Sequence, residues 1–169
     1  MMWKNTKRTM AGLALVTTCL VVLPGQTQAT PPGGVVGTPL LRGSFTDDVG
    51  VKFKLSFGDR TIVADAKNAS QVAFQNFTFA PGATTGWHSH PGPVVVLVKS
   101  GSLTYYQGSG SCVGRVYPAG TAFLDSGDGR AHIANNESGV TTETSVVYFG
   151  VPEGTSPRID EPAPGNCDF

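Results

Sequence analysis

The chain has 169 residues, 22 of them Gly and 12 of them Pro, and only 14% of its residues are charged. This charged fraction is well below the roughly 25% of a typical soluble domain. Twelve Lys and Arg balance twelve Asp and Glu, so we expect no nucleic-acid partner and no polybasic membrane-binding patch. The length suits one domain with a hydrophobic core rather than two.

Residues 1–29 have the layout of a secretory signal peptide. Three cations precede an apolar run over residues 11–23, which is too short to span a bilayer. Small residues then precede an expected cleavage after Ala29. Cys19 offers a lipid-anchored protein as an alternative, although the residues before it match a lipoprotein signal poorly. We therefore predict a secreted or periplasmic protein without a membrane span.

Residues 30–43 are rich in Gly and Pro and are predicted to form a flexible leader. After them, short apolar segments are separated by Gly, Pro, Asn and Asp, a pattern that predicts strands rather than helices. In residues 51–57 apolar side chains alternate strictly with polar ones. The predicted strands are residues 51–57, 61–67, 72–79, 93–99, 102–107, 113–117, 121–125, 131–135 and 140–149.

The third of these segments contains a change of parity. Its apolar residues have even numbers up to Phe74 and odd numbers from Phe77 onward. This change at Gln75 and Asn76 predicts a β-bulge or a strand that changes sheets. Taken together, nine or ten short strands at regular spacing predict an all-β sandwich or closed barrel over residues 44–151.

Two cysteines, Cys112 and Cys167, remain after removal of the signal peptide. In an oxidising compartment such a pair is expected to form a disulfide, with two free thiols as the alternative. The bridge would close a loop of about 55 residues and tie down residues 152–169. This C-terminal tail contains four prolines, so we predict an irregular structure for it.

Candidate chemistry is concentrated in three histidines, His88, His90 and His132, which are all that the chain contains. His88 and His90 are two residues apart, so on a strand both rings would project from the same face. Neutral imidazole is the commonest metal ligand, and such a pair can bind one ion if a third ligand joins it. The alternative is three ordinary polar residues at the rim of a barrel.

The spacing of these histidines resembles that of the cupin family, whose members are small double-stranded β-helix (jelly-roll) barrels. The resemblance covers about residues 70–150. It rests on Gly82, His88, His90 and Gly101 for the first cupin motif, and on Pro118, Ala119, Gly120, Gly129, His132 and Asn136 for the second. By this resemblance His88, His90 and His132 are metal ligands. Cupins frequently form homodimers, but the sequence itself carries no mark of one.

The sequence departs from the cupin pattern at two positions. Val94 stands where the first motif has its metal-binding glutamate, and Phe123 stands where a short second motif would have histidine. We expect an insertion to move that ligand to His132, with a barrel that keeps only two histidine ligands as the alternative. Asp125, Asp128 and Glu137 lie near His132 in the sequence and are candidate carboxylates to replace the missing glutamate. For each of them the alternative is a solvated turn or cap residue, more so for Asp128 and Glu137.

Three neutral ligands would leave a divalent ion (Zn, Mn, Fe or Ni) with its full double charge and an open coordination position, which favours a small anionic ligand. Arg130 has the parity of His132 and is a candidate to contact that anion, with an exposed loop arginine as the alternative. The leading hypothesis is an exported metal-binding cupin. The alternatives are a metal-dependent dioxygenase, isomerase or hydrolase acting on a small polar substrate, and an inert exported scaffold.

Overall fold

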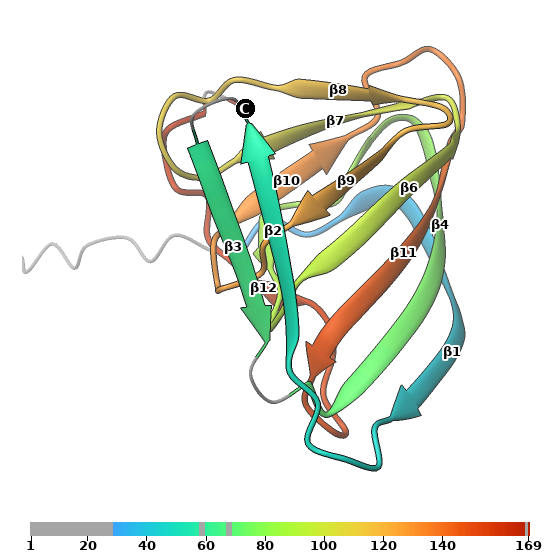
Figure 1. Cartoon of the computed structure of the whole chain (residues 1–169). Helices are drawn as coiled ribbons and strands as arrows, with labels where there is room; N and C mark the ends of the chain where they lie inside the picture. Colours follow the sequence, from blue (N-terminus) through green and yellow to red (C-terminus); the bar gives the residue numbers. More distant parts are fainter. Residues whose placement is uncertain (1–28, 58–59, 67–68, 168) are drawn as a thin grey trace, which may run out of the picture.

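The computed structural model of the chain describes residues 29–57, 60–66, 69–167 and 169 (Figure 1). The predicted signal peptide, residues 1–29, lies outside this part of the chain except for Ala29. The described residues form no helix long and apolar enough to cross a membrane. They form β1 (Gly33–Ser44), β2 (Val51–Phe57), β3 (Arg60–Ala66), β4 (Gln71–Thr84), β5 (His88–Ser89), β6 (Val94–Ser100), β7 (Ser102–Gln107), β8 (Arg115–Pro118), β9 (Ala122–Asp125), β10 (His132–Asn135), β11 (Thr142–Val151) and β12 (Ile159–Asp160).

Ten of these strands form one antiparallel sheet that curls into a nearly closed barrel (Figure 1). Its strand order is β12-β5-β10-β4-β11-β6-β9, with β1 added beside β4, and with β7 and β8 added beside β10. Along β11, buried and half-buried residues alternate over most of the strand, so one face lines the barrel and the other faces outward. The all-β barrel predicted from the sequence is confirmed.

The segment predicted to be a flexible leader is instead a strand. Residues 33–44 pair with β4 along nearly its whole length, so the prediction for residues 30–43 is wrong. Pro39 is tolerated because β1 is an edge strand, where a missing N–H leaves no neighbouring carbonyl unpaired. Val35 packs against the core, and Thr30 accepts a hydrogen bond from the Trp87 backbone N–H at 2.8 Å. The prediction of a flexible leader, which rested on Gly and Pro content alone, therefore missed an exposed edge strand.

The predicted change of parity within β4 is also absent. Gln71, Ala73 and Phe79 are buried, and the odd-numbered residues on both sides of the expected change, Ala73, Phe79 and the cavity-lining Gln75 and Phe77, share one face of the strand. Phe74 faces outward and is 41% exposed, so its hydrophobicity was misleading. The register irregularity lies in the partner strand, between Pro39 and Leu41 of β1.

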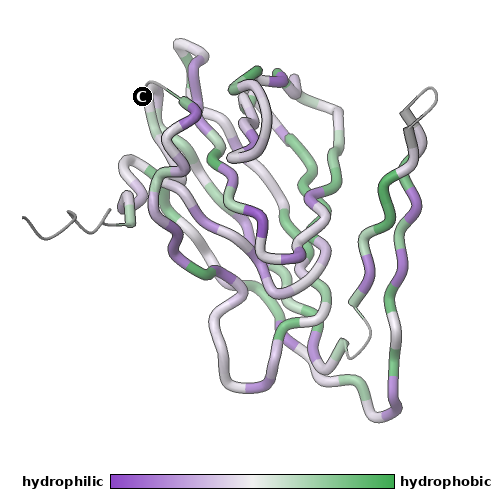
Figure 2. Tube along the Cα trace, turned by 90° about the vertical axis from the view of Figure 1, so that its left-hand side faces the viewer, coloured by the Kyte–Doolittle hydropathy of each residue, from purple (hydrophilic) through white to green (hydrophobic). Residues whose placement is uncertain are grey.

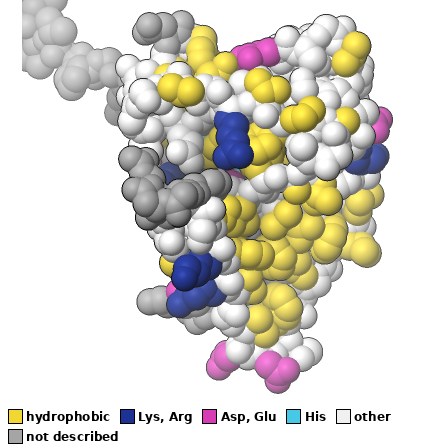
Figure 3. All heavy atoms as spheres, turned by 45° about the horizontal axis from the view of Figure 1, so that its top comes forward, with side chains coloured by type: hydrophobic (Ala, Val, Ile, Leu, Met, Phe, Trp, Pro, Cys, Tyr) yellow, Lys and Arg dark blue, Asp and Glu magenta, His cyan; other side chains and the backbone are white. Residues whose placement is uncertain are grey.

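Strands β2 and β3 form a separate two-stranded sheet beside the barrel (Figure 2). Phe53 joins this hairpin to the barrel, with its ring centroid 5.4 Å from that of Phe149. A shallow apolar groove lies between the hairpin and the outer face of β6, β8 and β9. Figure 3 shows many hydrophobic side chains on the face it presents, with Lys and Arg lying apart from one another.

The C-terminal tail returns to the barrel and is held there at several points. The predicted disulfide between Cys112 and Cys167 is present. Strand β12 pairs with β5, so the tail is not wholly irregular. The Arg42 guanidinium of β1 donates hydrogen bonds to the backbone carbonyls of Thr155 at 2.7 Å and Pro152 at 2.9 Å. These contacts place residues 156–158 over the mouth of the barrel.

Candidate metal centre

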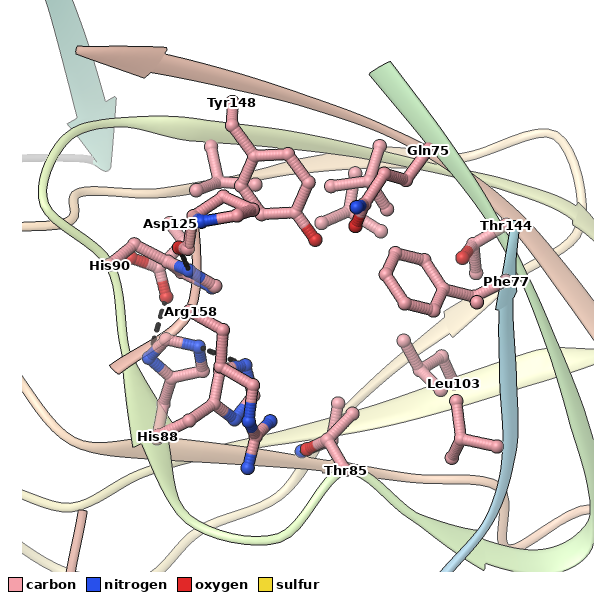
Figure 4. Close-up of a pocket in the computed structure, with 18 of the residues that line it drawn as sticks. Gln75, Phe77, Thr85, His88, His90, Leu103, Asp125, Thr144, Tyr148 and Arg158 are labelled. Carbon is pink, nitrogen blue, oxygen red and sulfur yellow. Dashed lines mark hydrogen bonds and ion pairs between the residues drawn. The ribbon is translucent and has the colours of Figure 1, made fainter. Parts of the chain in front are cut away.

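The three histidines come together inside the barrel. His88 in β5 and His132 in β10 are directly opposite each other in antiparallel register, and His90 follows two residues after His88. One ring nitrogen from each histidine lies within 4.8 Å of the other two. The Nε2 atoms of His88 and His132 are 3.1 Å apart (Figure 4). All three side chains are at most 6% exposed, so their proximity is part of the core rather than of a mobile surface.

Each of these rings has an oxygen acceptor for its Nδ1 atom. Because the acceptors are oxygens, Nδ1 is the donor in each of these contacts, and the Nε2 atoms are left to face the other rings, with those of His88 and His132 within hydrogen-bond distance of each other. The acceptors are the Gly86 carbonyl for His88 at 2.9 Å, the Pro157 carbonyl for His90 at 2.7 Å, and both the Asp125 carboxylate at 2.9 Å and the Arg130 carbonyl at 3.1 Å for His132. This is the hydrogen-bond pattern of histidines oriented to bind a metal ion.

Burial keeps the rings of His88 and His90 neutral. Desolvation, followed by the charges of the neighbouring histidines and Arg158, lowers the pKa of His88 well below its ordinary value. Desolvation and His132 lower the pKa of His90 to about 4, against the opposing effect of Asp125. Neutral imidazole is the form that coordinates metal. Both rings are therefore in the ligating state at neutral pH without first releasing a proton.

Asp125 lies behind His132 rather than beside the three Nε2 atoms. Its carboxylate accepts hydrogen bonds from the Tyr105 hydroxyl and the Gly127 backbone N–H, both at 2.7 Å, as well as from His132. Burial alone would raise the pKa of the Asp125 carboxyl, but His132 and the hydrogen bond from Tyr105 lower it overall. Asp125 is therefore an ionised carboxylate that orients His132.

A cavity of about 330 Å³ adjoins the three histidines. Most of its lining is apolar, with polar groups at a few points (Figure 4). Figure 4 shows the Tyr148 hydroxyl and the Gln75 amide pointing into this space, and Thr144 on the side away from the histidines. Thr144 is 1% exposed, and its hydroxyl has no hydrogen-bond partner among the described residues. The cavity can hold a small, largely apolar molecule next to the histidines.

The arginine that enters this cavity is Arg158, not Arg130. Arg130 lies in the turn before β10, where strand parity does not apply; its side chain is 64% exposed and pairs with Asp128. Arg158 comes from the C-terminal tail and lines the cavity. The sequence held one indirect signal for this, the cysteine pair, which predicted that the tail is tied to the barrel but not which residue enters it.

The donor set fits a metal ion. Two Nε2 atoms 3.1 Å apart can both lie about 2.0–2.1 Å from one ion, as zinc–imidazole bonds require. The third ring is within reach, and each ring is held by its own Nδ1 hydrogen bond. An ion at this point would face the cavity, so a small molecule could reach its open position.

Comparisons with known proteins found partial similarities. No family model matches the chain. The (R)-mandelonitrile lyase of Granulicella tundricola is 27% identical over 88 residues, which are 52% of this chain and only 62% of that protein. A solved oxalate oxidase with bound glycolate is 26% identical, with a TM-score of 0.42 over 47% of this chain and 41% of the other. The Cupin_2 domain of an XRE family transcriptional regulator from Enterobacter cloacae is 18% identical, with a TM-score of 0.44 over 72% of this chain and 100% of that domain.

The nearly closed antiparallel barrel and the converging histidines at cupin-motif spacing agree with the resemblance drawn from the sequence. The described residues form a nearly closed antiparallel all-β barrel, which is consistent with a cupin double-stranded β-helix. By the cupin resemblance, Val94 occupies the place of the first-motif glutamate; in the structure its side chain is buried and lines the cavity. The three histidines are positioned to hold a metal ion without that carboxylate.

Proposed function

We propose that this cupin is an exported protein that binds one divalent metal ion through the Nε2 atoms of His88, His90 and His132. In this proposal the adjoining cavity holds a small anionic ligand. The observation that carries it is that each of the three buried rings uses Nδ1 in a hydrogen bond to an oxygen, while one nitrogen from each ring meets the others. A metal-ligating histidine nearly always donates its other ring N–H in this way.

The surrounding residues would each have a separate role. Asp125 orients His132 through the 2.9 Å contact with Nδ1. The Pro157 carbonyl orients His90 in the same way, so the tail takes part in forming the site. A divalent ion held by three neutral imidazoles supplies a full double charge and an open position. Zn, Mn, Fe and Ni all accept imidazole ligands.

Export is proposed from the predicted signal peptide and from the disulfide. Residues 1–28 lie outside the described residues, so the signal peptide stays a sequence prediction. The Cys112–Cys167 bridge supports export because disulfides persist in oxidising compartments and are rare in the cytosol. We also expect a small-molecule partner rather than nucleic acid, because twelve Lys and Arg are balanced by twelve Asp and Glu and give no basic excess. A homodimer stays a prediction of the cupin resemblance alone.

A metal-dependent enzyme acting on a small polar substrate is the second candidate. It is favoured by the cavity beside the histidines and by a partial relative named as a lyase. Burial raises the pKa of the Tyr148 hydroxyl, so this group stays protonated and can donate a hydrogen bond into the cavity (Figure 4). Asp125 is the one carboxylate among the described cavity-lining residues, and its hydrogen bonds already occupy it. We therefore rank binding ahead of turnover, since no free base adjoins the site within the described residues.

The metal content of the untagged protein, measured by mass spectrometry after loading and desalting, tests this proposal. We expect about one ion per chain in the wild type and loss of that ion in His88→Ala and His132→Ala. Asp128→Asn is the matched control, because this exposed side chain belongs to the turn before His132 but does not contact the ring. A stoichiometry well below one in the loaded wild type would contradict the proposal. Oxygen uptake or turnover by the loaded protein would favour the enzyme instead.

A further inference from the structure

Arg158 is held in place by contacts on both sides of it in the chain. Immediately before it, the Pro157 carbonyl accepts the hydrogen bond from His90. Immediately after it, Ile159 and Asp160 pair with Ser89 and His88 in β12–β5. The backbone of Arg158 is therefore fixed by the same histidine-bearing segment that forms the candidate metal centre.

The guanidinium of Arg158 is only partly satisfied. Its Nε atom donates to Asp160 at 2.6 Å, whereas Nη2 is buried and has no hydrogen-bond partner among the described residues. Leaving a buried donor unpaired costs roughly 1–3 kcal/mol, more if it is charged. Asp160 is 62% exposed and therefore offsets this charge only weakly. An acceptor on a bound molecule could take the hydrogen bond that the Arg158 Nη2 atom leaves unused.

The described cavity lining offers no carboxylate that is free to pair with the Arg158 guanidinium. Asp125 is the one carboxylate among the described lining residues, and it is already engaged by Tyr105, Gly127 and His132. An incoming anion would thus meet an arginine and the proposed metal ion without competition from a second free carboxylate. Arginine matches a carboxylate especially well, because its planar N–H groups can donate two parallel hydrogen bonds.

The remaining walls limit the size and polarity of the occupant. The volume of about 330 Å³ equals that of roughly eleven waters at about 30 Å³ each. The apolar part of the lining includes Phe77, Phe79, Val96, Leu103, Phe123 and Val146. Inorganic phosphate or acetate would leave this apolar surface in contact with water, whereas a ring or branched chain would cover it.

We propose that the ligand of this cupin is a small organic monocarboxylate with an apolar body, and that Arg158 is the residue that selects its carboxylate. The inference rests on the proposed function for the identity of the site, but Arg158 and the cavity exist whether or not an ion is bound. The carboxylate lies at the mouth of the barrel beside Arg158, and the apolar body extends toward Phe77 and Leu103.

Calorimetric titration of the full-length, disulfide-intact protein tests this, with benzoate as the probe and benzamide, acetate and phosphate for comparison. We expect zinc-loaded protein to bind benzoate at least tenfold more tightly than benzamide, its neutral analogue, and than acetate or phosphate. Arg158→Gln should weaken benzoate binding at least tenfold and leave benzamide unchanged. Arg130→Gln is the matched control and should change neither, because that arginine lies outside the cavity.

Equal affinity for benzoate and benzamide, or an Arg158→Gln variant that binds benzoate like the wild type, would overturn the inference. Stronger binding of phosphate than of benzoate would also overturn it. If the Gln variant does not fold, Arg158→Lys retains the charge but loses the fork, and an intermediate loss of benzoate affinity is expected. The metal-free protein separates the two proposals. Arg158-dependent benzoate binding in a chain that takes up no zinc would support this inference while refuting the metal site.

Discussion

Val94 and Asp125 are directly paired across strands β6 and β9. By the cupin resemblance, Val94 stands where the motif has its metal-binding glutamate, so a buried carboxylate lies on the neighbouring strand directly opposite that position. Asp125 contacts Nδ1 of His132 instead of joining the three Nε2 atoms. This chain therefore has an acidic residue that supports a histidine, and has none at the position where the motif has its metal-binding glutamate.

Replacing Asp125 by Asn tests this supporting role. We expect metal affinity to fall about 10–100-fold, the usual effect of losing such a partner of a ligating histidine. The ion should still bind, because all three histidines remain. Competition with a chromophoric chelator measures the change.

Asp128→Asn provides the control for that experiment, since Asp128 is exposed and pairs with Arg130. It should bind metal like the wild type. Complete loss of metal in Asp125→Asn with the fold intact would mean that Asp125 is itself a ligand, which contradicts the role assigned to it.

The stability of the metal-free protein should decrease as pH falls from about 6.5 to about 4. Histidines in the unfolded chain bind protons below about pH 6.5, whereas folded His90 does so only near its lowered pKa of about 4. The unfolded state therefore holds more protons in this window, and acid favours it. For His90 alone the effect is on the order of 3 kcal/mol.

Urea unfolding of chelator-treated protein at pH 7 and at pH 4.5 measures this loss. Metal-loaded protein serves as the comparison, because a bound ion competes with protons and should extend the stable range toward lower pH. Equal unfolding free energies at the two pH values in the metal-free protein would contradict the burial of neutral histidines.

Breaking the Cys112–Cys167 disulfide should affect both stability and the metal centre. The bridge spans 55 residues, and the chain-entropy relation gives about 4 kcal/mol for a loop of that length. Release of the tail would also loosen the Pro157 carbonyl that orients His90. The double variant Cys112→Ser/Cys167→Ser should therefore unfold at lower urea concentration and bind metal more weakly. Unchanged metal affinity despite reduced stability would show that the tail does not help to form the site.

Gly37 in β1 tests how closely this edge strand packs against Phe77 of β4. A Cβ atom at this position would lie 2.8 Å from Cε1 of Phe77, whereas one at Gly43 of the same strand would meet no atom within 4 Å. Gly37→Ala should push the Phe77 ring toward the cavity and cost about 1–3 kcal/mol. Gly43→Ala should change the unfolding free energy by less than about 0.5 kcal/mol. Similar values for the two variants would argue against the close packing of β1 on β4.

Much of the fold and of the site could be predicted from local patterns. Alternation and turn residues predicted most strands, and the spacing of His88, His90 and His132 predicted their convergence. Patterns failed where long-range pairing overrides composition. Residues 33–44 form a strand because β4 offers them an edge, and Phe74 faces outward although it is hydrophobic. Arg158 could not be predicted at all, because its position depends on how the tail returns across the barrel.

Anomalous diffraction from crystals of the metal-loaded protein tests the central claim most directly. The account predicts one anomalous peak per chain, about 2.0–2.1 Å from the Nε2 atoms of His88, His90 and His132 if the ion is zinc, with Asp125 still hydrogen-bonded to His132. A peak bound by Asp125, or no peak among the three rings in protein shown to carry the ion, would contradict it.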